Sequence, residues 1–356
     1  MKIVICGNYG AQNEGDEMIL TGLLKSVKST VPKAQITVLS ADPTQTQKRH
    51  TIPTVKPFPT GIRSILNYIK QGTKTAKVVK ECDIFMLGGG GLFAGPSFRA
   101  NLIWATQAKM AYFYKKNVIM YGQSVGKSKN KIVNRIIKNI FNKASLITVR
   151  DQESKINLQN IGVTNEIHVM PDLAFRYSEK INPTKNKKVK VTVALREMSG
   201  LKKQFFNEIN GFLKWLKDEK NAEISYVNFQ EGELSDSHIH KKLKSKPKKN
   251  KIEDIKKADY IIGMRLHSII TAIKNEKPFV AINYFSKVKN LLNDVGLSNS
   301  LINLDEVTTT KLKTNFLKIE KDKLELKTKM AIYNKMAQEQ LINFEKSILT
   351  KVLNKG

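Results

Sequence analysis

The sequence predicts an α/β protein built from two domains that face each other across a cleft. Short apolar runs alternate with segments of helical periodicity, which is the pattern of parallel βαβ units. The 356 residues are too many for one ordinary hydrophobic core and suit two domains. Between the two halves, residues 182–188 interrupt the pattern with Pro, Asn and Lys, and they are the best candidate for a linker.

The first half predicts a domain over residues 1–180. Each expected strand is a short run of apolar and β-branched residues, and each expected helix repeats its apolar residues every three or four positions. The expected strands are 3–6, 36–39, 83–87, 117–121, 146–149 and 162–170. The expected helices are 15–27, 62–80, 101–114 and 131–142.

The second half predicts another domain over residues 189–310, followed by a helical tail over 311–356. One or two long amphipathic helices are expected between positions 310 and 353. The expected strands of the second domain are 189–195, 224–229, 260–262 and 279–282. Its expected helices are 204–217, 253–257 and 267–274.

The chain carries a net charge of +30, from 61 Lys and Arg against 31 Asp and Glu. Such a charge favours anionic partners, namely nucleic acid, an acidic membrane surface or an anionic glycan. It is equally consistent with a Lys-rich composition that only decorates the surface, so the charge names no partner. The chain has no zinc finger, RNP-like motif or interleaved basic and aromatic strip, which makes nucleic acid an unfavoured partner.

The two cysteines, Cys6 and Cys82, form no CxxC pair, so neither a disulfide framework nor a cysteine zinc site is expected. The apolar run at the start is too short for a secretion signal. No stretch of about 18 apolar residues is present, so no membrane-spanning helix is expected. We therefore expect a cytoplasmic protein, with peripheral contact to the inner face of the membrane as a further option.

Ligands of open parallel sheets bind beyond the carboxyl ends of the strands, and three such ends are unusually rich. The first is residues 7–17, whose three glycines allow a tight turn before a helix start that could hold an anion. The alternative is a structural turn in which Asp16 and Glu17 complement the helix dipole. The spacing is not GxGxxG, which argues against a dinucleotide.

The second strand end is the run of four glycines at 88–91. Successive amides without side chains can form a concave nest for an anion. A purely structural run is the alternative. Because the Lys and Ser/Thr of a Walker loop are missing, ATP hydrolysis is disfavoured.

The third strand end is residues 263–268, where Arg265 and His267 are two positions apart in a turn. Histidine suits proton transfer near neutral pH, and only this one of the five combines a strand end, a helix start and a neighbouring Arg. An ordinary capping or buried histidine is the alternative.

Arginine is rare in this Lys-rich chain, yet Arg150 and Arg265 both lie at strand ends. The guanidinium offers a planar fork for carboxylate or phosphate, which Lys lacks. Structural pairing of Arg150, for example with Asp151 or Asp172, is the alternative to a ligand-binding role.

Six segments occur in one order along residues 1–290: Gly7-Asn8-Tyr9-Gly10 with Asn13 and Gly15-Asp16-Glu17, Gly88–Gly91 with Leu92, Tyr121-Gly122-Gln123-Ser124-Val125-Gly126, Val149-Arg150-Asp151, Pro171-Asp172-Leu173-Ala174-Phe175, and Gly263-Met264-Arg265-Leu266-His267-Ser268. Together they resemble the polysaccharide pyruvyl transferase family. The resemblance implies a GT-B-like fold, with two Rossmann-like domains across a cleft and C-terminal helices packing across. It also implies a cytoplasmic transferase of cell-wall polysaccharide biosynthesis.

The implied reaction moves pyruvate from phosphoenolpyruvate to a sugar of a cell-surface polysaccharide or its lipid-linked precursor, and forms a ketal. Phosphoenolpyruvate is then a co-substrate, and neither a cofactor nor a metal is expected. An anionic or lipid-linked glycan is the expected partner.

The same resemblance implies roles for individual residues. The expected catalytic residues are His267 and Arg265. Phosphoenolpyruvate is expected to contact Arg150, Lys287, Gly89, Gly90 and Ser268, and the acceptor is expected to contact Tyr9 and Asn13. A GT-B-like glycosyltransferase that uses a nucleotide sugar is the alternative function.

Overall fold

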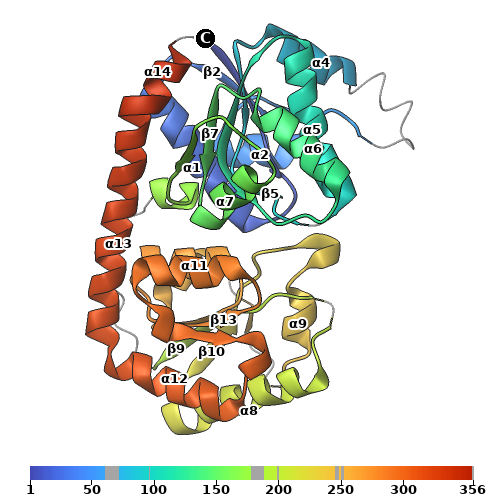
Figure 1. The fold of residues 1–356 in the computed structure, drawn as a ribbon. Coiled ribbons are helices and arrows are strands. Elements are labelled where there is room, and N and C mark those ends of the chain that lie inside the picture. Colours follow the sequence, from blue (N-terminus) through green and yellow to red (C-terminus); the bar gives the residue numbers. More distant parts are fainter. Residues whose placement is uncertain are drawn as a thin grey trace. The chain divides into compact units, whose positions relative to one another are not determined.

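Two parallel β-sheets organise the chain, each in its own compact unit (Figure 1). Unit 1 comprises Met1–Tyr177 and Ala337–Gly356, and unit 2 comprises Ser178–Met336. The computed structural model describes residues 1–60, 72–95, 97–177, 188–198, 200–244, 248–249 and 252–354. The predicted linker lies outside this part of the chain except for its last residue, and so does the first half of the helix predicted over 62–80.

The sheet of unit 1 is parallel throughout, in the order β3-β2-β1-β4-β6-β7-β8, with β5 paired to β6. After β1 the chain adds β2 on one side and later returns to add β4 on the other, so the strand order reverses there. The strands are β1 Lys2–Cys6, β2 Gln35–Leu39, β3 Thr54–Val55, β4 Ile84–Leu87, β5 Gly90–Phe93, β6 Asn117–Val125, β7 Leu146–Val149 and β8 Ile167–Val169.

The helices of unit 1 include two that the periodicity did not predict, α2 Pro43–His50 and α7 Gln152–Asn160. Both are short and polar, so their sequences carry no apolar repeat. They begin instead at side-chain caps, because Asp42 accepts a hydrogen bond from the Gln45 amide and Asp151 accepts one from the Ser154 amide. The helices are α1 Glu14–Thr30, α2 Pro43–His50, α4 Thr73–Glu81, α5 Phe98–Phe113, α6 Lys131–Phe141, α7 Gln152–Asn160 and the 3-10 turn η3 Leu173–Arg176.

Unit 2 contains a second parallel sheet, in the order β11-β10-β9-β12-β13-β14. Its strands are β9 Lys190–Ala194, β10 Glu223–Tyr226, β11 Lys248–Lys249, β12 Tyr260–Gly263, β13 Phe279–Asn283 and β14 Leu301–Asn303. Its helices include α8 Lys203–Lys220, α9 Ser237–Lys241, η5 Ile252–Lys257, α10 Leu266–Lys274, α11 Ser286–Val295 and α12 Thr309–Lys321. The prediction of an α/β protein with two Rossmann-like parallel sheets is confirmed.

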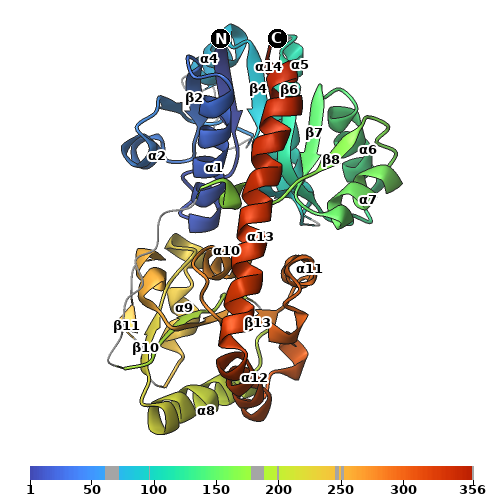
Figure 2. The ribbon, with the colours of Figure 1, turned by 90° about the vertical axis from the view of Figure 1, so that its left-hand side faces the viewer.

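The predicted C-terminal tail is helical, as α12 is followed by α13 Lys323–Phe344, the π-helical turn η8 Glu345–Leu349 and α14 Thr350–Leu353 (Figure 2). The division between the units falls inside α13, after Met336. Within unit 1, the buried Glu345 carboxylate accepts hydrogen bonds from Arg176 Nε at 2.7 Å and Nη2 at 3.0 Å. It also accepts hydrogen bonds from the hydroxyls of Ser26 and Ser29 on α1. The ion pair fastens the C-terminal segment to η3, and the two serine hydrogen bonds fasten it to α1.

We expect Glu345→Gln to destabilise unit 1 by about 3–5 kcal/mol, because it leaves the buried Arg176 guanidinium without its counter-charge. Amide hydrogen exchange of α1 measures the effect within this unit. Glu325→Gln, which removes an exposed carboxylate from α13, is the control and should change the free energy by less than about 0.5 kcal/mol. Equal protection of α1 in wild type and Glu345→Gln would show that the pair is dispensable.

Candidate active site

In unit 1, Asp16 lies where the carboxyl end of β1 meets the first turn of α1. The side chain of Asn13 caps this helix by accepting hydrogen bonds from the amides of Gly15, at 2.9 Å, and Asp16, at 3.2 Å. The Asp16 carboxylate accepts a hydrogen bond of 2.8 Å from the side-chain amide (Nδ2) of Asn8. A Cβ atom on Gly90 would lie 3.2 Å from Asp16 Oδ1, so this carboxylate borders the glycine run.

Burial raises the pKa of Asp16 to about 6. The hydrogen bond from Asn8 and the charge of Arg150 oppose this rise, whereas the carboxylates of Glu17 and Asp172 add to it. A carboxyl group with such a pKa can both donate and accept a proton near neutrality, which makes Asp16 an acid–base candidate. The sequence motif predicts a helix-dipole complement at Asp16 and no acid–base role, because the motif does not encode the burial of this side chain.

The neighbouring Glu17 has a different environment. Its carboxylate accepts a hydrogen bond from the Gly10 amide at 2.8 Å and lies 2.8 Å from His50 Nε2 on α2. Burial alone would raise the pKa of Glu17, but the hydrogen bonds from His50 and Gly10 outweigh it and lower the pKa. Glu17 therefore joins α1 to α2 as a carboxylate, with His50 as its partner.

Arg150, at the carboxyl end of β7, is engaged by two polar side chains. Its Nη1 donates to Asp172 Oδ2 at 2.7 Å, and its Nε donates to the hydroxyl of Ser124 on β6. Only 6% of the Arg150 side chain is exposed. The pairing with Asp172 is one of the alternatives that the sequence left open, and the role of Arg150 in binding a donor remains a prediction.

The glycine run of unit 1 packs closely against Tyr9, which is fully buried. A Cβ atom on Gly88 would lie 2.1 Å from the Tyr9 hydroxyl, and one on Gly89 would lie 2.9 Å from the Gly122 carbonyl oxygen. The Gly88 amide also donates to the Cys6 carbonyl at 2.7 Å, so it is already used. Close packing therefore accounts for these glycines, and the donor role of Gly89 and Gly90 remains a prediction.

The two residues expected at the acceptor are placed differently. Asn13 is half-buried at the start of α1 and uses its side-chain oxygen as the helix cap. Tyr9 lies in the core, and its hydroxyl has no hydrogen-bond partner in the part of the chain that the structure describes. Its burial favours a packing role, and contact of either residue with an acceptor remains a prediction.

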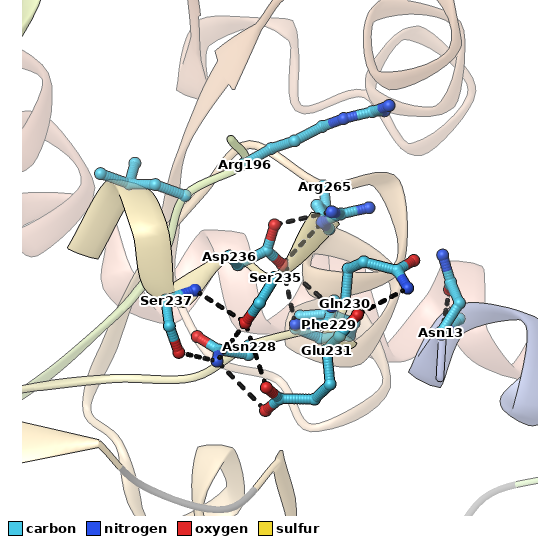
Figure 3. Close-up of polar contacts among 12 residues, drawn as sticks. Asn13, Arg196, Asn228, Phe229, Gln230, Glu231, Ser235, Asp236, Ser237 and Arg265 are labelled. Carbon is cyan, nitrogen blue, oxygen red and sulfur yellow. Dashed lines mark hydrogen bonds and ion pairs between the residues drawn. The ribbon is translucent and has the colours of Figure 1, made fainter. Parts of the chain in front are cut away.

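In unit 2, Arg265 occupies the N-cap position of α10, directly after β12. Its guanidinium forms a bidentate salt bridge with the Asp236 carboxylate (Figure 3). Nε lies 2.8 Å from Oδ2, and Nη2 lies 2.6 Å from Oδ1. The fully buried Asp236 also accepts hydrogen bonds of 3.0 Å from the amides of Phe229 and Gln230, which follow β10. Asp236 therefore fixes the plane of the Arg265 guanidinium. The Nη1 atom of Arg265 takes no part in this salt bridge.

His267 and Ser268 lie in the first turn of α10. His267 is half-buried and lies two positions after Arg265, and the catalytic roles of both residues remain predictions. Ser268 is fully buried and donates its hydroxyl to the Arg265 carbonyl at 2.6 Å, which makes it part of the turn. Lys287 is in the first turn of α11, after the neighbouring strand β13, with its ammonium 5.7 Å from the centroid of the Phe285 ring.

A polar network that the sequence did not predict lies beside Asp236 (Figure 3). Asn228 donates to Glu231 at 3.1 Å and to the hydroxyl of Ser237, and Lys249 pairs with Glu231 at 2.7 Å. These contacts connect the ends of β10 and β11. Because the residues come from loops without a recognisable motif, only the folded structure reveals the network.

His240, in α9, is a buried histidine. Its Nε2 accepts a hydrogen bond from the Leu195 amide at 3.2 Å, and its ring stacks on Tyr226 with centroids 4.3 Å apart. Burial lowers the pKa of His240 to about 3. The ring is therefore neutral at physiological pH and holds the end of β9.

Neither a metal centre nor a membrane span is indicated by the described ranges. They contain no group of three or more His, Cys, Asp or Glu side chains that could hold a metal ion. None of their helices is long and apolar enough to cross a bilayer.

The family model for polysaccharide pyruvyl transferases matches residues 13–286, well over half of the chain. The chain belongs to this family. The matched region includes Asp16, Arg150, Arg265 and His267, which lie at the carboxyl ends of the two sheets. The protein is therefore a transferase of polysaccharide biosynthesis. No curated protein sequence matches it significantly.

Solved structures show that this pyruvyl transferase family member has a GT-B fold. HepE of Anabaena, in complex with UDP and glucose, is 15% identical with a TM-score of 0.62, over 99% of this chain and 100% of that one. MnaA of S. aureus with UDP is 12% identical with a TM-score of 0.65, over 98% and 97%. UDP-GlcNAc 2-epimerase of Neisseria meningitidis, bound to UDP-GlcNAc, is 11% identical with a TM-score of 0.65, over 100% of both chains. At such identities the likeness shows the fold alone.

We expect Asp16→Asn to stabilise unit 1 of this pyruvyl transferase family member by about 1–3 kcal/mol at pH 8. The raised pKa means that the folded state disfavours the carboxylate, so the wild type loses stability as the pH rises from about 4 through 6. The asparagine does not titrate and should not show this loss. Hydrogen exchange of α1 at pH 5 and pH 8 measures the difference, and a variant less stable than wild type at pH 8 would contradict the argument.

We expect unit 2 to lose about 2 kcal/mol of stability between pH 7 and pH 5 through His240. Its folded-state pKa is depressed, so the stabilisation is present above the ordinary value of 6.5 and is lost as the pH falls toward 3. His240→Gln should remove this acid-dependent loss, which amide hydrogen exchange of β9 measures. His168→Gln, a substitution in unit 1, is the control and should leave the acid dependence of β9 unchanged.

Proposed function

We propose that this protein transfers pyruvate from phosphoenolpyruvate to a sugar of a cell-surface polysaccharide, or of its lipid-linked precursor, and forms a cyclic ketal. The observation that carries the proposal is that Arg265 and His267 lie two positions apart at the start of α10, within the region that matches the family. This helix start offers a fixed cation and a proton-transfer group at the carboxyl edge of a parallel sheet, where ligands bind.

The donor carries a carboxylate and a phosphate, so it needs fixed positive groups. Asp236 holds two nitrogens of Arg265, and the remaining Nη1 can meet an anion without reorganising the side chain. Lys287 lies in the first turn of α11, which follows the neighbouring strand β13. The amides at the start of α10 add hydrogen-bond donors. These groups form the proposed donor site of unit 2.

The proposed chemistry needs one proton at carbon 3 of the donor and two bonds at carbon 2. His267 delivers the proton to carbon 3, while a sugar hydroxyl bonds through its oxygen to carbon 2 and passes its own proton to the His267 imidazole, which restores it. The bond from carbon 2 to the phosphate oxygen then breaks, and a second hydroxyl of the sugar bonds to carbon 2 and closes the ring. Its proton leaves with the phosphate. Asp16, with its raised pKa, is a second acid–base candidate.

The acceptor is proposed to be an anionic or lipid-linked glycan, met in the cytoplasm. The net charge of +30 does not itself identify a partner, but it is compatible with a lipid-linked acceptor at an acidic membrane surface, which attracts Lys side chains.

The competing function is transfer from a nucleotide sugar, since three structures of the same fold contain UDP or UDP-GlcNAc. The shift of the melting temperature separates the two. Under our proposal phosphoenolpyruvate raises it more than UDP does, because only the true donor binds the folded state tightly. A larger shift with UDP would favour the glycosyltransferase.

We expect His267→Ala to lower phosphate release from phosphoenolpyruvate by about 10²–10⁴-fold at unchanged melting temperature, because it removes the proton donor. Arg265→Lys should raise KM for phosphoenolpyruvate by roughly tenfold, because an ammonium cannot serve Asp236 and the donor in one plane. Arg135→Lys on the exposed face of α6 is the matched control. If Arg265→Lys behaves like wild type, the guanidinium has no such role.

A further inference from the structure

Unit 2 contains a pocket of about 710 Å³ at the carboxyl ends of β9, β13 and β14. Its lining comes from three segments, residues 200–205, 283–286 and 303–308, which include the starts of α8 and α11. The residues that follow β12 do not contribute to the lining. The volume lies in the upper half of the range of about 300–1,000 Å³ for small-molecule sites. It is far more than a three-carbon donor needs, so the pocket suits a larger ligand.

One wall of the pocket carries polar side chains from the ends of β13 and β14. Asn283 donates its side-chain amide to Asn303 Oδ1 at 3.1 Å, which fixes the orientation of both groups. The Asn303 side chain is exposed, and its Oδ1 has a second lone pair that can accept a hydrogen bond from a hydroxyl group of a ligand. Asp305 adds a carboxylate to the same lining.

Two aromatic rings supply apolar surface next to these acceptors. Tyr284 is held by Arg196, whose guanidinium lies 5.0 Å from the ring centroid and donates to the phenol oxygen. Phe285 is 48% exposed although it is a large apolar residue at the pocket. An exposed, positioned ring of this kind can cover the apolar face of a flat ligand.

Two helices begin at the pocket and supply donors. The N-cap positions of α8 and α11 are Lys202 and Phe285, and neither side chain caps its helix. The amides of Phe205 and Val288 donate to the N-cap carbonyls, whereas the earlier amides of Gln204 and Ser286, at the pocket, can donate to a ligand. Donors, acceptors and aromatic faces together fit a polyhydroxylated ring, whereas the Asp305 carboxylate opposes a purely anionic ligand.

The geometry points to this pocket as a carbohydrate subsite that holds a hexose or N-acetylhexosamine unit of the glycan acceptor. The assignment of that sugar to the acceptor rests on the proposed function, but binding of a sugar here does not. The hydroxyl groups donate to Asn303 and Asp305 and accept from the amides of Gln204 and Ser286 at the starts of α8 and α11. The Phe285 ring covers the carbon–hydrogen face of the sugar.

Saturation-transfer NMR with methyl glycosides of glucose, galactose and N-acetylglucosamine, and with their disaccharides, tests this binding without phosphoenolpyruvate. We expect at least one probe to bind, and we expect Phe285→Ala and Asp305→Asn each to weaken its binding roughly tenfold. Both positions are exposed, so neither change should disturb folding. Phe113→Ala, an exposed aromatic at the end of α5 in unit 1, is the matched control and should bind as wild type.

The outcomes separate this inference from the proposed function. With an active acceptor, the two variants should raise KM for the glycan roughly tenfold and leave KM for phosphoenolpyruvate unchanged. Sugar binding that the variants weaken, without phosphate release in the wild type, would leave the subsite standing and reject the pyruvyl transfer. Phosphate release with wild-type KM for the glycan in both variants, or no binding of any probe, would reject the subsite.

Discussion

Parallel strand pairing is the constraint on which the candidate site depends. Because each described sheet is parallel, the loops that follow its strands all lie at one edge, whatever their separation in the sequence. In unit 1 this brings Asp16 into the electrostatic range of Arg150 and Asp172, and in unit 2 it brings Arg265 onto Asp236. At both edges a buried Arg is balanced by an Asp from a neighbouring loop, since either charge alone would be costly to bury.

The two Arg–Asp pairs leave different possibilities for function. Arg150 is divided between Asp172 and Ser124 and is almost fully covered, so a ligand could reach it only by displacing a partner. Arg265 bonds to Asp236 through Nε and Nη2, and its Nη1 is not part of this salt bridge. A side chain that is oriented in advance loses little entropy when it meets an anion, which favours Arg265 as the donor-binding arginine.

The sequence was most informative where a pattern has a direct physical cause. Alternation of buried strands and amphipathic helices predicted both sheets, and the Gly263–Ser268 motif located the loop of Arg265. It failed where the cause is tertiary. The short polar helix α2 depends on the cap at Asp42, and the partner of Arg265 lies 29 positions away in an unremarkable loop. The raised pKa of Asp16 follows from burial, which no motif encodes.

Asp16 and Glu17 are adjacent in the chain, yet the fold moves their pKa values in opposite directions. Glu17 is stabilised as a carboxylate by the Gly10 amide and His50, and it joins two helices. Asp16 has one hydrogen bond from Asn8, which does not offset its burial. The divergence of the two neighbouring carboxylates therefore makes Asp16, which borders the glycine run, the acid–base candidate of the two.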